Sequence, residues 1–90
     1  MQNESFSMSP EQCRAARGLL GWSQKDLGAA VGLSAVSVRA FEKGGAIRAS
    51  NAARIIEAFR AHGVALIGNG ESSSTGGPGV RLASAQPDAD

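Results

Sequence analysis

Segment 23–44, with the sequence SQKDLGAAVGLSAVSVRAFEKG, constrains the fold of this chain most, because it holds two short helix signals separated by a glycine. Ser23 followed by Asp26 is typical of a helix N-terminus, where a serine caps the first turn and an acid lies within it. Apolar residues then recur at helical spacing until Gly32 interrupts the pattern. The sequence therefore predicts a first helix over residues 24–31.

A second helix signal follows that glycine. Ser34 can cap the helix, and Val38 and Phe41 lie three residues apart, which places an apolar pair on its inner face. The pattern predicts a helix over residues 35–43, ended by Gly44. Two helices joined by a short turn that contains glycine form the helix-turn-helix unit, whose second helix enters the major groove of DNA.

The segment from residue 14 to about residue 59 resembles the phage-repressor and Cro-type helix-turn-helix proteins, also called XRE-like. The resemblance implies an all-α core of four short helices around a central helix-turn-helix, as in lambda repressor. Gly28 departs from the family, which usually has alanine there; we expect only that a small side chain is needed, and glycine costs a helix about 1 kcal/mol relative to alanine. The residues that carry the resemblance are Gln24, Leu27, Gly32, Ser34, Val38, Glu42 and Gly44.

Two further helices flank this unit in the sequence. Ser9, a proline and a glutamine predict a capped helix that runs to Leu20, with the single cysteine, Cys13, as a small buried thiol. Trp22 is expected to fold over the corner that follows. On the other side, Ser50 is expected to cap a fourth helix over residues 51–62.

The C-terminal third of the chain changes from helical to strand patterning. Residues 64–67 and 80–82 are apolar or β-prone and are separated by a Gly/Ser/Thr-rich stretch, so we expect a β-hairpin. An isolated two-stranded hairpin is only marginally stable, so it must pack on the helices or pair with another chain. The expected organisation is a flexible arm at 1–8, a helix-turn-helix domain at 9–63, a hairpin and candidate dimerisation element at 64–82, and a disordered tail at 83–90.

Charge and composition narrow the class of protein. The formal net charge is only +1, but residues 9–63 contain eight basic and four acidic side chains, a balance of +4. One cysteine cannot form an internal disulfide, and no long apolar run or signal-peptide pattern is present. We therefore expect a cytoplasmic protein with a mildly basic core, no membrane segment and no metal site.

The resemblance also implies which residues meet DNA. Arg39 can present its guanidinium to guanine and is the favoured base contact, with a solvated or ion-paired arginine as the alternative. Val36 can contact a thymine methyl, but an incidental exposed apolar residue explains it equally simply. The base-reading set is Ala35, Val36, Ser37, Arg39 and Ala40. The phosphate-binding set is Gln24, Ser34, Lys43 and Arg48, for which ordinary surface polarity is the alternative.

Arg17 and Glu42 have a different expected role. The resemblance implies that they form a structural ion pair, which holds the second helix of the unit against the first helix of the domain. Glu42 is therefore left out of the DNA-reading set, since an unpaired carboxylate there would repel phosphate.

These features predict a sequence-specific, DNA-binding transcriptional regulator that reads double-stranded, palindromic DNA as a homodimer. The alternative is a protein-interaction module or antitoxin-like adaptor that uses the C-terminal hairpin. The first hypothesis requires Arg39, Lys43 and Arg48 to be exposed together, whereas the second does not. An enzyme is not expected, because the sole histidine, His62, has no catalytic partner at a telling spacing; no cofactor or small-molecule ligand is evident.

Overall fold

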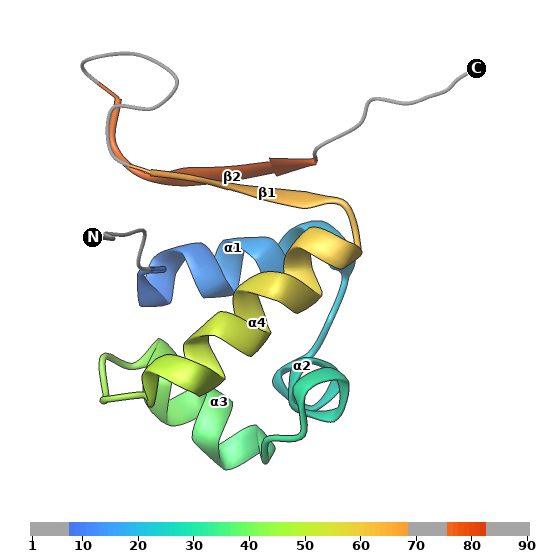
Figure 1. Cartoon of the computed structure of the whole chain (residues 1–90), viewed down its shortest axis with the longest axis vertical. Helices are drawn as coiled ribbons and strands as arrows, with labels where there is room; N and C mark the ends of the chain where they lie inside the picture. The colour runs from blue at the N-terminus through green and yellow to red at the C-terminus, as the bar shows by residue number, and fades with distance from the viewer. Residues whose placement is uncertain (1–7, 69–75, 83–90) are drawn as a thin grey trace.

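The computed structural model describes residues 8–68 and 76–82, which form four helices followed by a two-stranded hairpin (Figure 1). The fold class predicted from the sequence is confirmed. The predicted flexible arm, apart from its last residue, and the predicted disordered tail lie outside the described residues. The elements are α1 (Pro10–Leu20), α2 (Gln24–Val31), α3 (Ala35–Glu42), α4 (Ala49–Ala61), β1 (Val64–Ile67) and β2 (Gly79–Leu82).

Local capping determines where the first two helices begin and end. Ser9 accepts a hydrogen bond from the backbone of Gln12, whose side chain bonds back to the backbone of Ser9, and the same reciprocal capping box joins Ser23 and Asp26. Gly21 ends α1 in the left-handed conformation, with φ 68°. These bonds span only three residues, so the sequence was sufficient to predict both helices.

The start of α4 differs from the prediction. The helix begins at Ala49 with Arg48 in the capping position, and Arg48 makes no side-chain capping bond. The predicted Ser50 cap is therefore wrong. Ile47, the residue before the Arg48 cap, packs against the core, and an apolar residue in that position fixes the angle at which the chain enters a helix. Tertiary packing, rather than a serine cap, sets this boundary.

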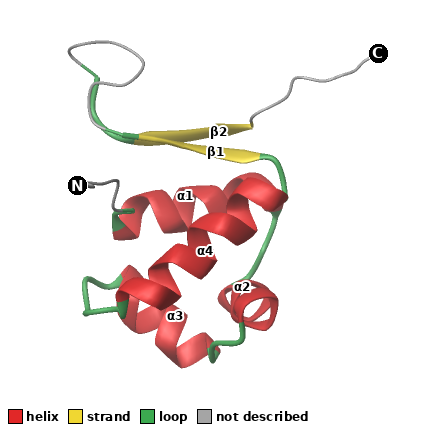
Figure 2. Ribbon diagram, viewed as in Figure 1, coloured by secondary structure: helices red, strands yellow, loops and turns green. Residues whose placement is uncertain are grey.

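The core lies where the four helices meet beneath the hairpin (Figure 2). Met8, which we expected in a flexible arm, is 7% exposed and belongs to this core, so that prediction is wrong. It immediately precedes the Ser9 cap, a position from which an apolar side chain commonly packs on the first helical turns. The other buried apolar residues are Cys13, Ala16, Leu27, Val31, Val38, Phe41, Ile55, Phe59 and Val64.

Gly28 lies at the tightest approach between α2 and the turn that follows it. A Cβ atom at this position would lie 2.4 Å from the backbone carbonyl oxygen of Leu33, closer than any real contact. Leu33 also donates a backbone hydrogen bond to the Gly28 carbonyl at 2.9 Å. The expectation that a small side chain is needed here agrees with this close approach, and glycine avoids the overlap that an alanine Cβ would cause.

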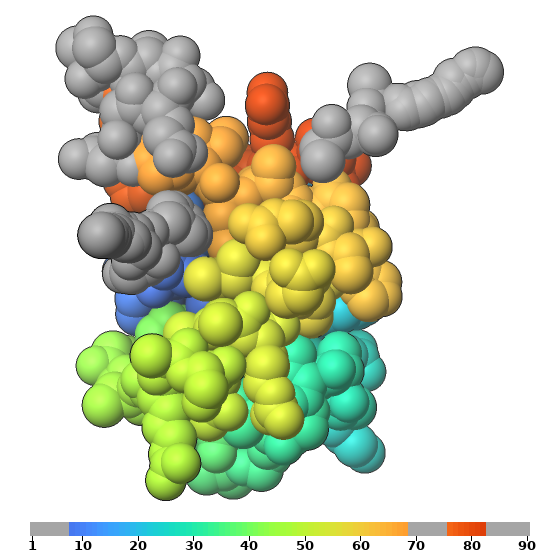
Figure 3. Space-filling view, in the orientation of Figure 1, coloured from blue at the N-terminus to red at the C-terminus, as the bar shows by residue number. Residues whose placement is uncertain are grey.

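The hairpin lies across the helical layer (Figures 1 and 3). In it, β1 contacts mainly α4, and β2 contacts α1. The strands are antiparallel, with Val64 opposite Leu82 and Leu66 opposite Val80. Gln12 fastens them to α1, since its Nε2 donates to the carbonyl oxygens of Ile67 at 2.9 Å and Gly79 at 3.0 Å. The hairpin is thus part of the same folded body as the helices.

Candidate nucleic-acid interface

Helix α3 has one anchored face and one open face. Val38 is fully buried and Phe41 is 6% exposed, so these two residues fix the rotation of the helix about its axis. Val36, on the opposite side, is 76% exposed. Ser37, Arg39 and Ala40 are also exposed, and Ala35 is half-buried. All five residues of the predicted base-reading set therefore retain solvent access on one short helix.

Three cations lie on or beside this helix. Arg39 is on α3, Lys43 takes the C-cap position, and Arg48 precedes α4; all three are exposed. Within residues 8–68 and 76–82, none of them forms an ion pair. A cleft between α3 and the start of α4 is lined in part by Ser37 and Arg48. A polyanion that approached α3 would therefore meet uncompensated positive charge.

The start of α3 is organised by two serines. Ser34 accepts a hydrogen bond from the backbone N–H of Ser37, which caps the helix, and its hydroxyl is hydrogen-bonded to the Ser37 hydroxyl at 3.1 Å. Because a hydroxyl proton rotates, either serine can be the donor in this bond, and the proton of the other is then available for an external acceptor.

Arg17 and Glu42 form a two-pronged ion pair between α1 and α3. Arg17 Nε lies 2.7 Å from Glu42 Oε2, and Arg17 Nη2 lies 2.7 Å from Glu42 Oε1. The Glu42 side chain is 2% exposed and that of Arg17 is 17% exposed. Arg17 also donates to the carbonyl of Trp22 at 3.0 Å, and Arg14 donates to the Glu42 carbonyl. The end of α3 is therefore held against α1 by several charge-assisted bonds.

Two more donors complete the environment of the Glu42 carboxylate. Cys13 Sγ lies 3.1 Å from Oε2, and Gln24 Nε2 lies 3.1 Å from Oε1. Burial by itself raises the pKa of Glu42, but the hydrogen bonds from Arg17, Gln24 and Cys13 outweigh it and hold that pKa below its ordinary value. The pKa of the Cys13 thiol is raised, mainly by burial and to a lesser degree by the hydrogen bond to Glu42. The carboxylate thus stays ionised beside a neutral thiol.

Sequence reasoning assigned Gln24 to phosphate but did not anticipate its bond to Glu42. The two residues are 18 positions apart, and no local pattern links the first residue of one helix to the last residue of the next. With Gln24 on α2, Arg17 and Cys13 on α1, and Glu42 on α3, the carboxylate connects three helices at one point.

This arrangement agrees with a comparison against known families. A family model described as helix-turn-helix matches residues 14–64, more than half of the chain. The chain belongs to the XRE-type helix-turn-helix family. This family assignment supports a DNA-binding regulator in general. The sequence matches no curated protein.

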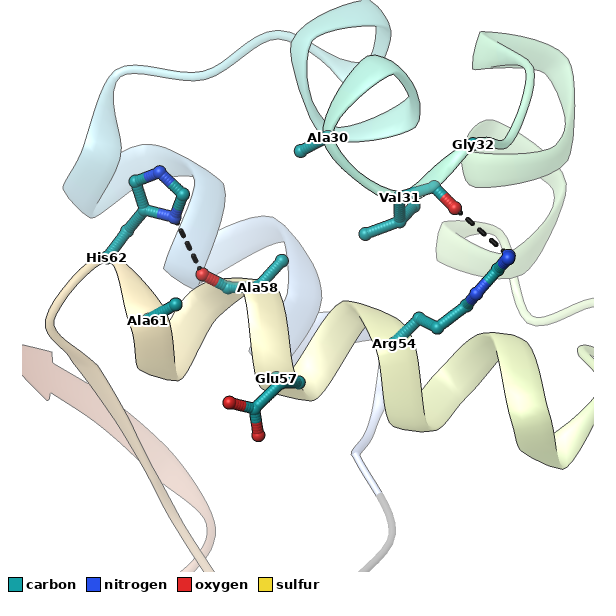
Figure 4. A pocket seen from close by; sticks show the side chains of 8 residues that line it. All are labelled: Ala30, Val31, Gly32, Arg54, Glu57, Ala58, Ala61 and His62. Atoms are coloured by element: carbon teal, nitrogen blue, oxygen red, sulfur yellow. Dashed lines mark hydrogen bonds between the residues drawn. The ribbon is translucent and has the colours of Figure 1, made fainter.

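A second cleft separates α2 from α4 on the face drawn in Figure 4. Its polar groups already have partners: Arg54 donates to the Val31 carbonyl at 3.1 Å, Glu57 pairs with Arg60 at 3.2 Å, and His62 Nδ1 lies 2.8 Å from the Ala58 carbonyl. The ring of His62 also packs edge-on against Trp22, with centroids 4.8 Å apart. These contacts hold the side chains at the helix ends and in the packing between α2 and α4.

Two further features concern the described residues alone. None of the helices is long and apolar enough to cross a membrane. In the same ranges, no group of three His, Cys, Asp or Glu side chains could hold a metal ion.

Proposed function

We propose that this helix-turn-helix protein is a sequence-specific transcriptional regulator that reads the major groove with α3. The observation that supports the proposal most directly is the open face of α3, where Val36, Ser37, Arg39 and Ala40 are exposed while Val38 on the other side is buried. An exposed recognition helix with uncompensated cations beside it meets both requirements for DNA readout, namely contact with bases and attraction to phosphates.

The proposed roles divide between the interior of α3 and its ends. Arg39 lies one turn inside the helix and would reach guanine O6 and N7, while Val36 would contact a thymine methyl. Ala35, Ser37 and Ala40 complete the base-reading set. Lys43 and Arg48 would bind phosphates, as would Gln24 and Ser34 at the starts of α2 and α3. The regulator would act in the cytoplasm as a homodimer on a palindromic operator, because two half-sites provide the affinity that one short helix lacks.

The experiment compares Arg39→Ala with Lys43→Ala on a duplex selected by the wild-type protein and on random duplexes, over a range of salt concentrations. Arg39→Ala should cost about 1–3 kcal/mol on the selected duplex and relax the preference at one base pair per half-site. Lys43→Ala should weaken binding to all duplexes alike and reduce the salt dependence by about one phosphate per subunit.

Identical behaviour of the two variants would contradict the division between base and phosphate contacts. Failure of the wild-type protein to bind either duplex at low salt would favour the alternative, a protein-interaction module or antitoxin-like adaptor that acts through the hairpin.

A further inference from the structure

Glu42 contacts a residue that the proposed function assigns to DNA, although Glu42 itself is buried. Its relative exposure is 3%, and its carboxylate accepts four hydrogen bonds, two from Arg17, one from Cys13 and one from Gln24. A carboxylate offers about four lone-pair sites, so these donors use its full capacity. Such a group cannot rotate without breaking several charge-assisted bonds, and it therefore provides a fixed point for each donor.

Of the two N–H groups of the Gln24 side-chain amide, one is hydrogen-bonded to Glu42 and the other has no partner among the described residues. Its Nε2 carries two N–H groups, of which one is directed to Glu42 Oε1 at 3.1 Å. Among the described residues the Gln24 amide has no other hydrogen-bond partner. The side chain is half-buried at the first position of α2, where the backbone N–H groups of the first turn have no partner within the helix. The capping box of Ser23 and Asp26 provides an acceptor for the backbone N–H of Asp26. The backbone N–H of Gln24 has no acceptor within the helix.

We propose that Glu42 is a positioning residue for DNA binding, which holds the Gln24 amide so that its second N–H meets a backbone phosphate. This inference rests on the proposed function. Arg17 supports Glu42 from the other side, so the ion pair that joins α1 to α3 also sets the orientation of a contact on α2. A long glutamine side chain fixed in advance loses less conformational entropy when it binds.

The charge of Glu42 makes the proposal testable. Loss of a negative charge near DNA should strengthen binding through electrostatics alone. Loss of a positioning group should weaken it instead. The two effects have opposite signs, so Glu42→Gln distinguishes them. Glu57→Gln is the matched control, since it removes the same charge from an exposed residue of α4 and should leave binding unchanged or slightly tighter.

The experiment is a double-mutant cycle of Gln24→Ala and Glu42→Gln, measured as affinity for the duplex selected by the wild-type protein. Gln24→Ala should weaken binding by about 10- to 100-fold, the usual effect of losing a hydrogen bond to a charged group. Glu42→Gln should weaken binding by a similar factor when Gln24 is present and by less than about twofold when position 24 is alanine. The salt dependence should not change, because Gln24 carries no charge to release counterions.

Equal losses from Glu42→Gln in both backgrounds would overturn the inference while the proposed function stands. Absence of wild-type binding to any duplex would overturn both. A second measurement avoids any folding defect of the variants: the ¹⁵N relaxation of the Gln24 side-chain NH₂ in the free wild-type protein. We expect values close to those of the backbone of α2, and values typical of a mobile surface glutamine would overturn the inference.

Discussion

Glu42 is the residue whose removal should affect stability most. Glu42→Ala removes the carboxylate partner of the Arg17 guanidinium, whose side chain is only 17% exposed in the wild-type protein, and leaves the donors of Cys13 and Gln24 unpaired. Breaking a buried pair in this way costs about 3–5 kcal/mol. Denaturant unfolding monitored by circular dichroism measures the loss. Glu57→Ala removes an exposed pair and should cost less than about 1 kcal/mol. Equal stabilities of the two variants would show that the Glu42 pair contributes nothing beyond a surface contact.

Gly28 and Gly18 both lie in helices but differ in the space around them. Only Gly28 is in close contact with another part of the backbone. An added Cβ at Gly28 would meet the Leu33 carbonyl at 2.4 Å, whereas at Gly18 nothing lies within 4 Å. Gly18→Ala should therefore raise the free energy of unfolding by up to about 1 kcal/mol, through helix propensity alone. Gly28→Ala should lower it by about 1–3 kcal/mol, because overpacking exceeds the gain in propensity. Thermal unfolding of both variants measures these changes in stability. A Gly28→Ala protein that melts at a higher temperature than the wild type would contradict the close approach at Gly28.

At the scale of the elements, the hairpin receives two backbone-directed hydrogen bonds from one side chain of α1, that of Gln12. Gln12 accepts from the backbone of Ser9 and donates to Ile67 and Gly79 at once. Gln12→Ala leaves two carbonyls of the hairpin without this donor, and we expect a cost of about 1–3 kcal/mol with faster amide exchange in β1 and β2. Ser9→Ala is the control, because it removes the cap of α1 at a cost of about 1 kcal/mol but keeps the bonds to the hairpin.

Hydrogen exchange separates these two variants. Exchange that accelerates in the hairpin for Gln12→Ala but mainly in α1 for Ser9→Ala would agree with the bonding. The same exchange pattern in both variants would mean that Gln12 acts only as a helix cap and that the strands are held by apolar contacts alone.

At the scale of the whole molecule, the prediction concerns assembly. Two of the three large apolar residues that are exposed in the described ranges lie away from α3: Leu19 on α1, at 43%, and Leu82 on β2, at 54%. If the hairpin forms the proposed homodimer interface, Leu82→Asp should convert the protein to a monomer at micromolar concentration. Its affinity for a palindromic operator should then fall to that for a half-site, whereas affinity for an isolated half-site should not change.

Sedimentation velocity with and without the operator makes this measurement. A wild-type protein that sediments as a monomer both alone and on DNA would contradict the homodimer. A dimer that Leu82→Asp leaves intact would place the interface elsewhere.

Much of the helical architecture followed from the sequence because its signals are local. The capping boxes of Ser9 and Ser23 join residues three apart, and Gly21 and Gly32 end their helices by adopting positive φ. The apolar or β-prone residues at 64–67 and 80–82 likewise located both strands, and the spacing around the central turn was enough to indicate the family. Such interactions form within one turn of helix or one strand, so they can be predicted from the sequence alone.

Other features were decided by tertiary structure, because they join residues far apart in the chain. Gln12 meets the hairpin across 55 and 67 positions, and Gln24 meets Glu42 across 18. Met8 belongs to the core, and α4 begins at Ala49 without the predicted serine cap. In each case the sequence contains a residue able to cap a helix, pack in the core or donate a hydrogen bond. The packing of the helices then determines which partner lies within reach of that residue.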